Sequence, residues 1–328
     1  MDITYASSVA ASNAIQGFAD LIAPVKPEEF LTQFAGKKPL YIPGAPDKFT
    51  FAMSWDHMNR ILNQSNIWTP HTLQLVLDTV VLGAEQFARE GIGRDGAQTY
   101  LVDFDKVKGL LRKGASLVLN EIETLTPGMK RITEILSRQP GGKVQANLYC
   151  SWQKHQAFDV HFDTHDVFAM QIVGEKAWRV YQRHFKDPIN HPAFKSLPSQ
   201  FHHAHKGDLL MEFTMRPGDL VYVPSGFYHE ALAESDSTVH ISFSVVPLIG
   251  LDIVSMLFDF GVMDEVFRQP VPQPEERGGA ALDEYLMRVA GRFRELLRDP
   301  KVKAQIAGAV RNFRHPLERI DLNGEDRG

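Results

Sequence analysis

The sequence predicts a mainly β fold, a sandwich or barrel of short strands, with helices before the strands and a helical region after them. Short β-rich runs recur between Ser116 and Val246, and glycine, proline and other turn residues separate them. No Gly-x-Gly-x-x-Gly or P-loop sequence follows any of these runs, so the nucleotide-binding folds have no support. Beyond Pro247 the β signal stops.

The N-terminal part is expected to contain helices and one edge strand. Residues up to about Leu21 fit an amphipathic helix or a loose arm. In Lys26–Phe34, a proline occupies the helix start and two glutamates the first turn, where they complement the helix dipole. Prolines bound the short run Pro39–Pro43, which predicts an edge strand. The pattern also predicts helices at residues 53–63 and 83–90 and extended chain at 73–82 and 98–102.

The strands of the barrel are predicted from runs of β-branched and aromatic residues bounded by turns. Regular spacing of such short strands favours a sandwich or barrel over a parallel sheet with crossover helices. The runs are Ser116–Leu119, Val144–Cys150, Val167–Val173, Ala177–Tyr181, Leu209–Phe213, Asp219–Val223 and Thr238–Val246.

The C-terminal region is predicted to be helical, so the expected division of the chain is residues 1–250 and 251–328. Gly250 to about Phe267 is apolar and helical, and Pro270–Gly279 is a linker or an exposed loop. Ala280–Arg298 is predicted to be an amphipathic helix whose apolar stripe either packs onto the barrel or forms a dimer interface. The stripe consists of Leu282, Leu286, Val289, Phe293, Leu296 and Leu297.

Composition is that of a soluble globular enzyme, with 44% hydrophobic and 23% charged residues. A net charge of -5 argues against naked nucleic acid as the main partner. The single cysteine, Cys150, cannot form an internal disulfide, which favours a reducing cytoplasm. No run of about eighteen apolar residues predicts a membrane helix, and the N-terminus lacks the basic start of a signal peptide. A cytoplasmic location without membrane contact is therefore expected.

The residues that point to chemistry are His161 and Asp163, which flank Phe162. On a strand, residues two apart project from the same face, so both side chains can reach one metal ion. A third ligand is expected from His229, at the start of the strand that follows the Pro224–Phe227 turn. Two imidazoles and one carboxylate leave open positions on the metal, as non-haem Fe(II) oxygenases need. The same three ligands can also hold zinc with a catalytic water.

Several motifs resemble, in order and in spacing, the JmjC oxygenases of the ribosomal-oxygenase, or cupin-4, family. The resemblance runs from about residue 26 to residue 246 and implies a double-stranded β-helix, the jelly-roll barrel of JmjC and cupin proteins. The motifs are Pro27-Glu28-Glu29-Phe30-Leu31, Lys38-Pro39-Leu40, Asn147-Leu148-Tyr149, His161-Phe162-Asp163, Asp166-Val167-Phe168-Ala169-Met170-Gln171, Gly174-Glu175-Lys176-Ala177-Trp178-Arg179-Val180-Tyr181 and Pro217-Gly218-Asp219-Leu220-Val221-Tyr222-Val223-Pro224 with His229-Glu230.

The resemblance implies that His161, Asp163 and His229 are iron ligands and that 2-oxoglutarate and O2 are co-substrates. Lys176, fifteen residues after the first ligand, matches the family's basic residue that pairs with the distal carboxylate of 2-oxoglutarate. A buried cation fits a dicarboxylate, whose charge would otherwise lose its water without gaining a partner. The alternative for Lys176 is a solvated position in the hairpin after Gly174.

Four further side chains are implied around the co-substrate. Asn147 and Tyr149 alternate onto one strand face and match residues that line its pocket, and Tyr149 also fits the alternative of a core aromatic. His240 and Ser242 share a face of the final strand and are expected to complete the pocket.

Other reactive side chains are given structural interpretations. The run that contains His202, His203 and His205 is expected to be a long solvated or substrate-facing loop, which is favoured over a second metal site. His165 either faces the substrate or lies on the rim of the pocket. Cys150 is expected to be a buried, inert thiol.

The implied activity is hydroxylation of an amino-acid side chain in a protein or peptide, with a ribosomal protein as one candidate. Two alternatives stay open: the same chemistry on a small molecule or free amino acid, and a cupin that binds metal without turnover, as a sensor. The His-Phe-Asp ligand pair and Lys176 favour the oxygenase over the sensor. Roughly eighty residues follow Val246. They suffice for the dimerisation helices of the larger ribosomal oxygenases but not for the winged-helix domain that follows there.

Overall fold

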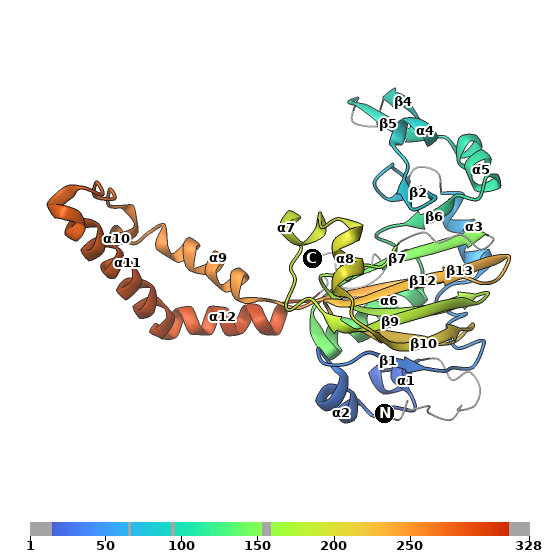
Figure 1. Ribbon diagram of the computed structural model, residues 1–328, viewed down its shortest axis with the longest axis horizontal. Helices are drawn as coiled ribbons and strands as arrows, with labels where there is room; N and C mark the ends of the chain where they lie inside the picture. Colours follow the sequence, from blue (N-terminus) through green and yellow to red (C-terminus); the bar gives the residue numbers. More distant parts are fainter. Residues whose placement is uncertain (1–14, 65–66, 93–95, 153–158, 315–328) are drawn as a thin grey trace, which may run out of the picture. The chain divides into compact units, whose positions relative to one another are not determined.

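The computed structural model describes residues 15–64, 67–92, 96–152 and 159–314 (Figure 1). The chain divides into one compact unit that ends at Val246 and a second unit, Pro247–Arg314. All the strands in the described ranges belong to the first unit, and the second unit consists of helices and their connections. Among the described residues, no helix is both long enough and apolar enough to cross a membrane.

Two antiparallel sheets form the barrel of the first unit. The larger sheet contains β1 (Leu40–Ile42), β2 (Leu73–Leu77), β3 (Val80–Val81), β6 (Ser116–Leu119), β7 (Lys143–Trp152), β8 (Asp166–Val173), β11 (Leu220–Val223) and β13 (Ser237–Val246), and the smaller one β9 (Lys176–His184), β10 (Leu209–Met215) and β12 (Phe227–Ala233).

The strand order of the larger sheet is β1-β11-β8-β13-β7-β6-β2-β3, and that of the smaller sheet is β10-β9-β12. Neighbours such as β8 and β13 are far apart in the sequence, so the chain passes repeatedly between the sheets, as in a jelly roll. The predicted barrel is therefore confirmed, and each of the seven predicted strands overlaps an observed one. The predicted edge strand is β1, at one end of the larger sheet.

Alternating side chains along the larger sheet supply two separate apolar cores. On β8, Phe168 and Met170 pack into the large core between this sheet and the helices that cover its outer face. Val167 and Ala169, which project from the opposite face, pack against Trp178 of β9 in a second core between the two sheets. The larger sheet therefore has an apolar core on each of its two faces, because successive side chains along a strand project to opposite faces.

Several helices and two π-helical turns precede β7 in the chain. They are α1 (Phe18–Ile22), α2 (Pro27–Glu29), η1 (Phe30–Phe34), α3 (Trp55–Leu62), α4 (Ala84–Phe87), α5 (Phe104–Arg112), α6 (Pro127–Leu136) and η3 (Ser137–Gly141). The helix predicted at residues 83–90 is wrong beyond Phe87. Ala88 begins β4 (Ala88–Ile92), whose backbone pairs with β5 (Gln98–Val102), and this pairing ends the helix after one turn.

The connection between β9 and β10 also differs from the prediction. It contains two short helices, α7 (Pro192–Lys195) and α8 (Ser199–His205), where a long loop was expected. Histidine is only a moderate helix former, so α8 depends on tertiary contacts. His202 supplies such a contact, because its ring lies edge-on to Phe162 at 5.3 Å. Within the helix, the ring of His205 stacks on Phe201 with centroids 3.9 Å apart.

The second unit contains α9 (Gly250–Gly261), α10 (Glu265–Arg268), the 3-10 turn η4 (Glu276–Gly279), α11 (Ala280–Arg298) and α12 (Pro300–Asn312). Its own small core joins Leu257, Leu296 and Val302. The bounds of α11 agree with the predicted amphipathic helix. Its apolar stripe is divided, because Leu296 is buried in this core whereas Leu286 remains 51% exposed.

Candidate metal centre

The backbones of His161 and His229 are paired directly across the mouth of the barrel. The amide of His161 donates to the carbonyl of His229 at 3.1 Å, and the amide of His229 donates to the carbonyl of His161 at 2.8 Å. This antiparallel bridge lies at the start of the segment that leads into β8, opposite β12. Reciprocal bonding places the two side chains on the same face, with ring centroids 4.6 Å apart.

Asp163 completes a set of three donors. One ligand atom each from His161, Asp163 and His229 lies within 4.8 Å of the others, and Asp163 Oδ2 is 3.5 Å from His229 Nε2. Each histidine uses Nδ1 for a backbone carbonyl, that of Asp159 at 2.8 Å and that of Phe227 at 3.0 Å. A carbonyl can only accept, so Nδ1 carries the hydrogen and Nε2 is the nitrogen suited to a metal.

The charge states also suit a metal ion. Burial, assisted by the charge of His161, lowers the pKa of His229 to about 4. Burial acts to raise the pKa of Asp163, but the charges of His165, His229, His161 and Lys195 outweigh it and hold that pKa below its usual range. Near pH 7 the site therefore presents a neutral imidazole and a carboxylate, which are the metal-binding forms of these groups.

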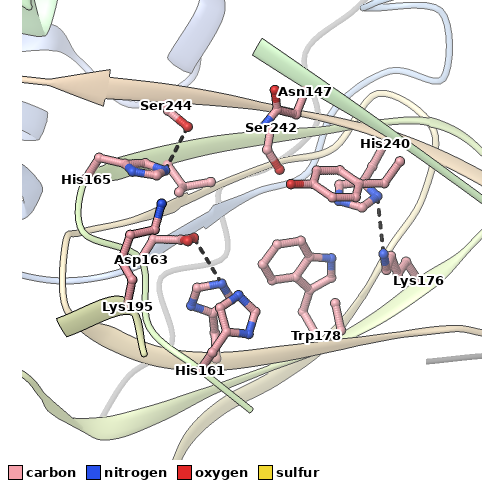
Figure 2. A pocket seen from close by; sticks show the side chains of 14 residues that line it. Asn147, His161, Asp163, His165, Lys176, Trp178, Lys195, His240, Ser242 and Ser244 are labelled. Carbon is pink, nitrogen blue, oxygen red and sulfur yellow. Dashed lines mark hydrogen bonds and ion pairs between the residues drawn. The ribbon is translucent and has the colours of Figure 1, made fainter. Parts of the chain in front are cut away.

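A cavity of about 240 Å³ opens from the three donors into the space between the two sheets. It far exceeds the roughly 10–15 Å³ that one water molecule occupies, so a small organic molecule fits inside. All eight predicted site residues line it, as do six others (Figure 2). The predicted ones are Asn147, Tyr149, His161, Asp163, Lys176, His229, His240 and Ser242, and the others are His165, Val167, Trp178, Lys195, Ala231 and Ser244.

Lys176, on β9 of the smaller sheet, lies next to His240, on β13 of the larger sheet, and both line the cavity. Its side chain is 5% exposed, so the alternative of a solvated hairpin position is wrong. The ammonium lies 3.2 Å from Nδ1 of His240, whose ring stacks on Tyr149. Burial lowers the pKa of Lys176 to about 7, and burial together with the Lys176 charge lowers the pKa of His240 well below its usual value. His240 is therefore the neutral acceptor of this pair.

Trp178 separates the Lys176 side of the cavity from the histidine donors. Its ring stacks on His229 with centroids 5.8 Å apart and meets His240 edge-on at 6.0 Å. The indole Nε1 is buried and has no hydrogen-bond partner among the described residues. A buried donor left without a partner is costly, which points to a bound acceptor at this position. Trp178 was not predicted as a site residue, although it lies two residues after Lys176 on the same strand face.

Three further side chains that line the cavity near Asp163 were not predicted as site residues from the sequence. Nε2 of His165 lies 2.7 Å from Oγ of Ser244, and the exposed Lys195 of α7 reaches the cavity wall beside Asp163 (Figure 2). Ser244 continues the face of β13 that carries His240 and Ser242, and this alternation is the signal that identifies it. Lys195 had no such signal, because it comes from the helix that replaces the expected loop.

Cys150 shows how strictly β7 alternates. Asn147 and Tyr149 face the cavity, whereas Cys150 packs in the large apolar core. Burial raises the pKa of its thiol to about 12, so it presents no thiolate near neutral pH. The inert, buried thiol expected from the sequence is present.

The cavity fits a metal ion and a dicarboxylate. Two imidazoles and a carboxylate suit Fe(II) and leave positions for other ligands. Among the described residues, no carboxylate lies within ion-pair distance of Lys176, and the indole N–H of Trp178 has no acceptor. An anionic ligand in the cavity would supply a partner for both groups. The three metal donors, together with Lys176 and Trp178, thus suit a metal ion that is chelated by a small dicarboxylic acid.

Comparisons with known proteins agree with this architecture. Residues 118–249 match the family described as the JmjC domain. Ribosomal oxygenase 1 of Rattus norvegicus is 31% identical over 136 residues, which are 41% of this chain and 22% of that protein. The bifunctional lysine-specific demethylase and histidyl-hydroxylase NO66 of Drosophila willistoni is 24% identical over 229 residues, 69% of this chain and 28% of that protein. The chain thus spans about a quarter of the length of these relatives.

A solved structure has the same fold. YcfD, a ribosomal oxygenase from Escherichia coli in complex with cobalt and 2-oxoglutarate, superposes with a TM-score of 0.57 at 17% identity, over 90% of this chain and 73% of that one. The expected double-stranded β-helix is therefore confirmed as the fold of the strands described above.

Proposed function

We propose that this chain, whose residues 118–249 match the JmjC domain family, is an Fe(II)- and 2-oxoglutarate-dependent oxygenase that hydroxylates an amino-acid side chain in a protein or peptide. His161, Asp163 and His229 would hold the iron, and Lys176 would bind the distal carboxylate of 2-oxoglutarate. Asn147, Tyr149, His240 and Ser242 would line the co-substrate pocket.

The buried ammonium of Lys176, in the same cavity as the three metal donors, carries this proposal. A metal sensor or a zinc hydrolase needs the donors but has no use for a buried lysine that has a neutral histidine and no carboxylate as its partner among the described residues. Burying such a charge is unfavourable unless a ligand neutralises it. A dicarboxylate that chelates the metal at one end and reaches Lys176 at the other satisfies both groups.

When bound, Fe(II) and 2-oxoglutarate supply O2 activation and C–H hydroxylation, with succinate and CO2 as products. The chain's own contribution is geometric and electrostatic. The neutral His240 accepts from Lys176 and keeps its ammonium directed into the cavity. Trp178 offers the indole hydrogen as a second donor and, as an apolar wall beside His229, excludes water from the metal.

The names of the relatives support a polypeptide substrate. The rat protein is called a ribosomal oxygenase, and the Drosophila protein is called a histidyl-hydroxylase and a lysine-specific demethylase. We propose a protein substrate for this chain on that basis, with ribosomal proteins as the first candidates. The small-molecule alternative predicts turnover with free amino acids, which the same assay can measure.

Two further features are proposed with this function. The helices of the second unit expose large apolar side chains, among them Phe258 at 70% and Met287 at 72%, which supports a homodimer formed through this region. The single buried cysteine supports a reducing compartment such as the cytoplasm.

Anaerobic calorimetry of 2-oxoglutarate binding, with and without Mn(II) in place of Fe(II), tests the proposal. One-to-one binding that requires the metal is the expected result. Absence of binding under both conditions would contradict the oxygenase and leave a metal-binding cupin. Succinate formation with Fe(II) and O2, measured against peptides and free amino acids, then separates the two substrate classes.

A further inference from the structure

The three histidines of α8 have no part in the proposed chemistry, yet two of them, His202 and His203, contact the segment that carries the metal ligands. Nε2 of His203 lies 3.1 Å from Oδ1 and 3.0 Å from Oδ2 of Asp159. The hydroxyl of Ser199, at the start of the same helix, donates to Oδ2 of Asp159. Helix α8 therefore holds one carboxylate by two side chains that are one helical turn apart.

Asp159 transmits this contact to the metal centre through its backbone. Its carbonyl accepts the Nδ1 hydrogen of His161 at 2.8 Å. Its carboxylate Oδ1 also accepts from the amide of Val160 at 2.8 Å, which fixes the turn between the two residues. The position of the Asp159 carbonyl decides how the His161 imidazole is oriented and which of its nitrogens carries the hydrogen.

The opposite face of the ligand segment is held by the same helix. Phe162, between the two ligands, points away from the cavity into a cluster with Val160, Tyr181 and Tyr228. The ring of His202 meets Phe162 edge-on at 5.3 Å and Tyr228 at 5.8 Å. Helix α8 thus contacts the segment at its start through Asp159 and at its centre through Phe162.

We infer that α8 is a positioning element of the metal centre, in which Ser199 and His203 fix Asp159 so that its carbonyl holds His161 with Nε2 as the metal-binding nitrogen. The inference rests on the proposed function, since it takes His161 as a metal ligand. Substitution of Ser199 or His203 leaves the Asp159 carbonyl chemically intact and removes only what fixes its place. The variants therefore test position and leave the ligand set untouched.

The test is anaerobic titration of the full chain with Co(II) against a competing chelator, together with the visible spectrum of the bound ion. Loss of an outer partner of a ligand typically costs 10–100-fold in metal affinity, so we expect about a tenfold loss for Ser199→Ala combined with His203→Ala, and a changed Co(II) spectrum. His203→Gln keeps an N–H donor in reach of Asp159 and should restore affinity to within about twofold of the unaltered chain.

His205→Ala is the matched control, because it removes the ring stacked on Phe201 of the same helix and does not touch Asp159. It should lower the melting temperature of the metal-free chain without changing Co(II) affinity or spectrum. Should the double variant fail to fold by circular dichroism, Ser199→Ala alone gives the same readout, with a smaller but measurable loss.

Unchanged Co(II) affinity and spectrum in the variant that combines Ser199→Ala with His203→Ala would overturn the inference. An equal loss in His205→Ala would overturn it too, because helix stability would then explain the effect. Failure of the unaltered chain to bind Co(II) would refute the proposed function and the inference together.

Discussion

The proposed co-substrate contact makes 2-oxoglutarate binding dependent on pH. Burial lowers the pKa of Lys176 to about 7, so in the empty cavity this side chain is charged below that pH and neutral above it. A dicarboxylate binds the ammonium form. Binding at alkaline pH must therefore add a proton to Lys176, and the affinity must fall as the pH rises.

The magnitude follows from the pKa. With a value of about 7, about half of the Lys176 side chains are protonated at pH 7 and about one in eleven at pH 8. Binding at pH 8 should then take up about 0.9 proton for each 2-oxoglutarate. The affinity should fall about fivefold between pH 7 and pH 8, and about tenfold for each further pH unit.

Calorimetry in two buffers with different enthalpies of ionisation measures this proton uptake directly. The chain is saturated with Mn(II) under nitrogen at every pH, so that metal occupancy does not change between the measurements. Lys176→Arg is the control, because a guanidinium stays charged throughout this range and should bind without proton uptake. A constant affinity from pH 7 to pH 8.5 with no proton uptake would refute the assignment of Lys176 to the dicarboxylate.

Five substitutions test the remaining assignments. Lys176→Ala should weaken 2-oxoglutarate binding by roughly 1.5–3 kcal/mol, the worth of a hydrogen bond to a charged group, and an unchanged affinity in calorimetry would refute the pocket. His161→Ala or Asp163→Ala should abolish one-to-one binding of Mn(II) in equilibrium dialysis, and retention of one ion per chain would place the metal elsewhere. Trp178→Phe keeps an aromatic ring in the cavity wall but loses the indole N–H, so 2-oxoglutarate should bind about 0.5–1.5 kcal/mol more weakly while Mn(II) affinity stays the same. Met287→Glu puts a charge on the exposed face of α11 and should convert a dimer to a monomer in light scattering, which a monomeric unaltered chain would contradict.

Much of the barrel could be predicted because its strands obey a local rule. Apolar and polar residues alternate along β7 and β13, so Asn147, Tyr149, His240 and Ser242 were expected on the cavity face, where the structure has them. The pair His161 and Asp163 was identified by the same period of two, although it lies before β8 and only His161 is paired, through an isolated bridge to His229. Their roles as ligands, like that of Lys176, remain predictions for the experiments above.

What the sequence did not reveal depends on contacts between distant segments. Helix α8 forms from a histidine-rich run with moderate helix propensity, and its stability comes from rings and a carboxylate elsewhere in the chain. Helices α5 and α6 were also missed. They begin at the N-caps Asp103 and Thr126, whose side chains accept backbone amide hydrogens, but their apolar faces are short. Lys195 was missed for the same reason, because it lies on α7, in the connection where a loop was expected.

The reciprocal backbone hydrogen bonds between His161 and His229 keep the two ligands close together in the metal-free protein. In an unfolded chain the two imidazoles are separated by a long loop, and bringing them together costs entropy that the metal alone would have to offset. In the barrel, main-chain hydrogen bonds have already closed that loop, so an incoming ion meets ligands that need little rearrangement. Metal at a hundred times its dissociation constant should then stabilise the folded state by about 2.7 kcal/mol. A chelator should consequently lower the melting temperature and leave a barrel ready to be reloaded.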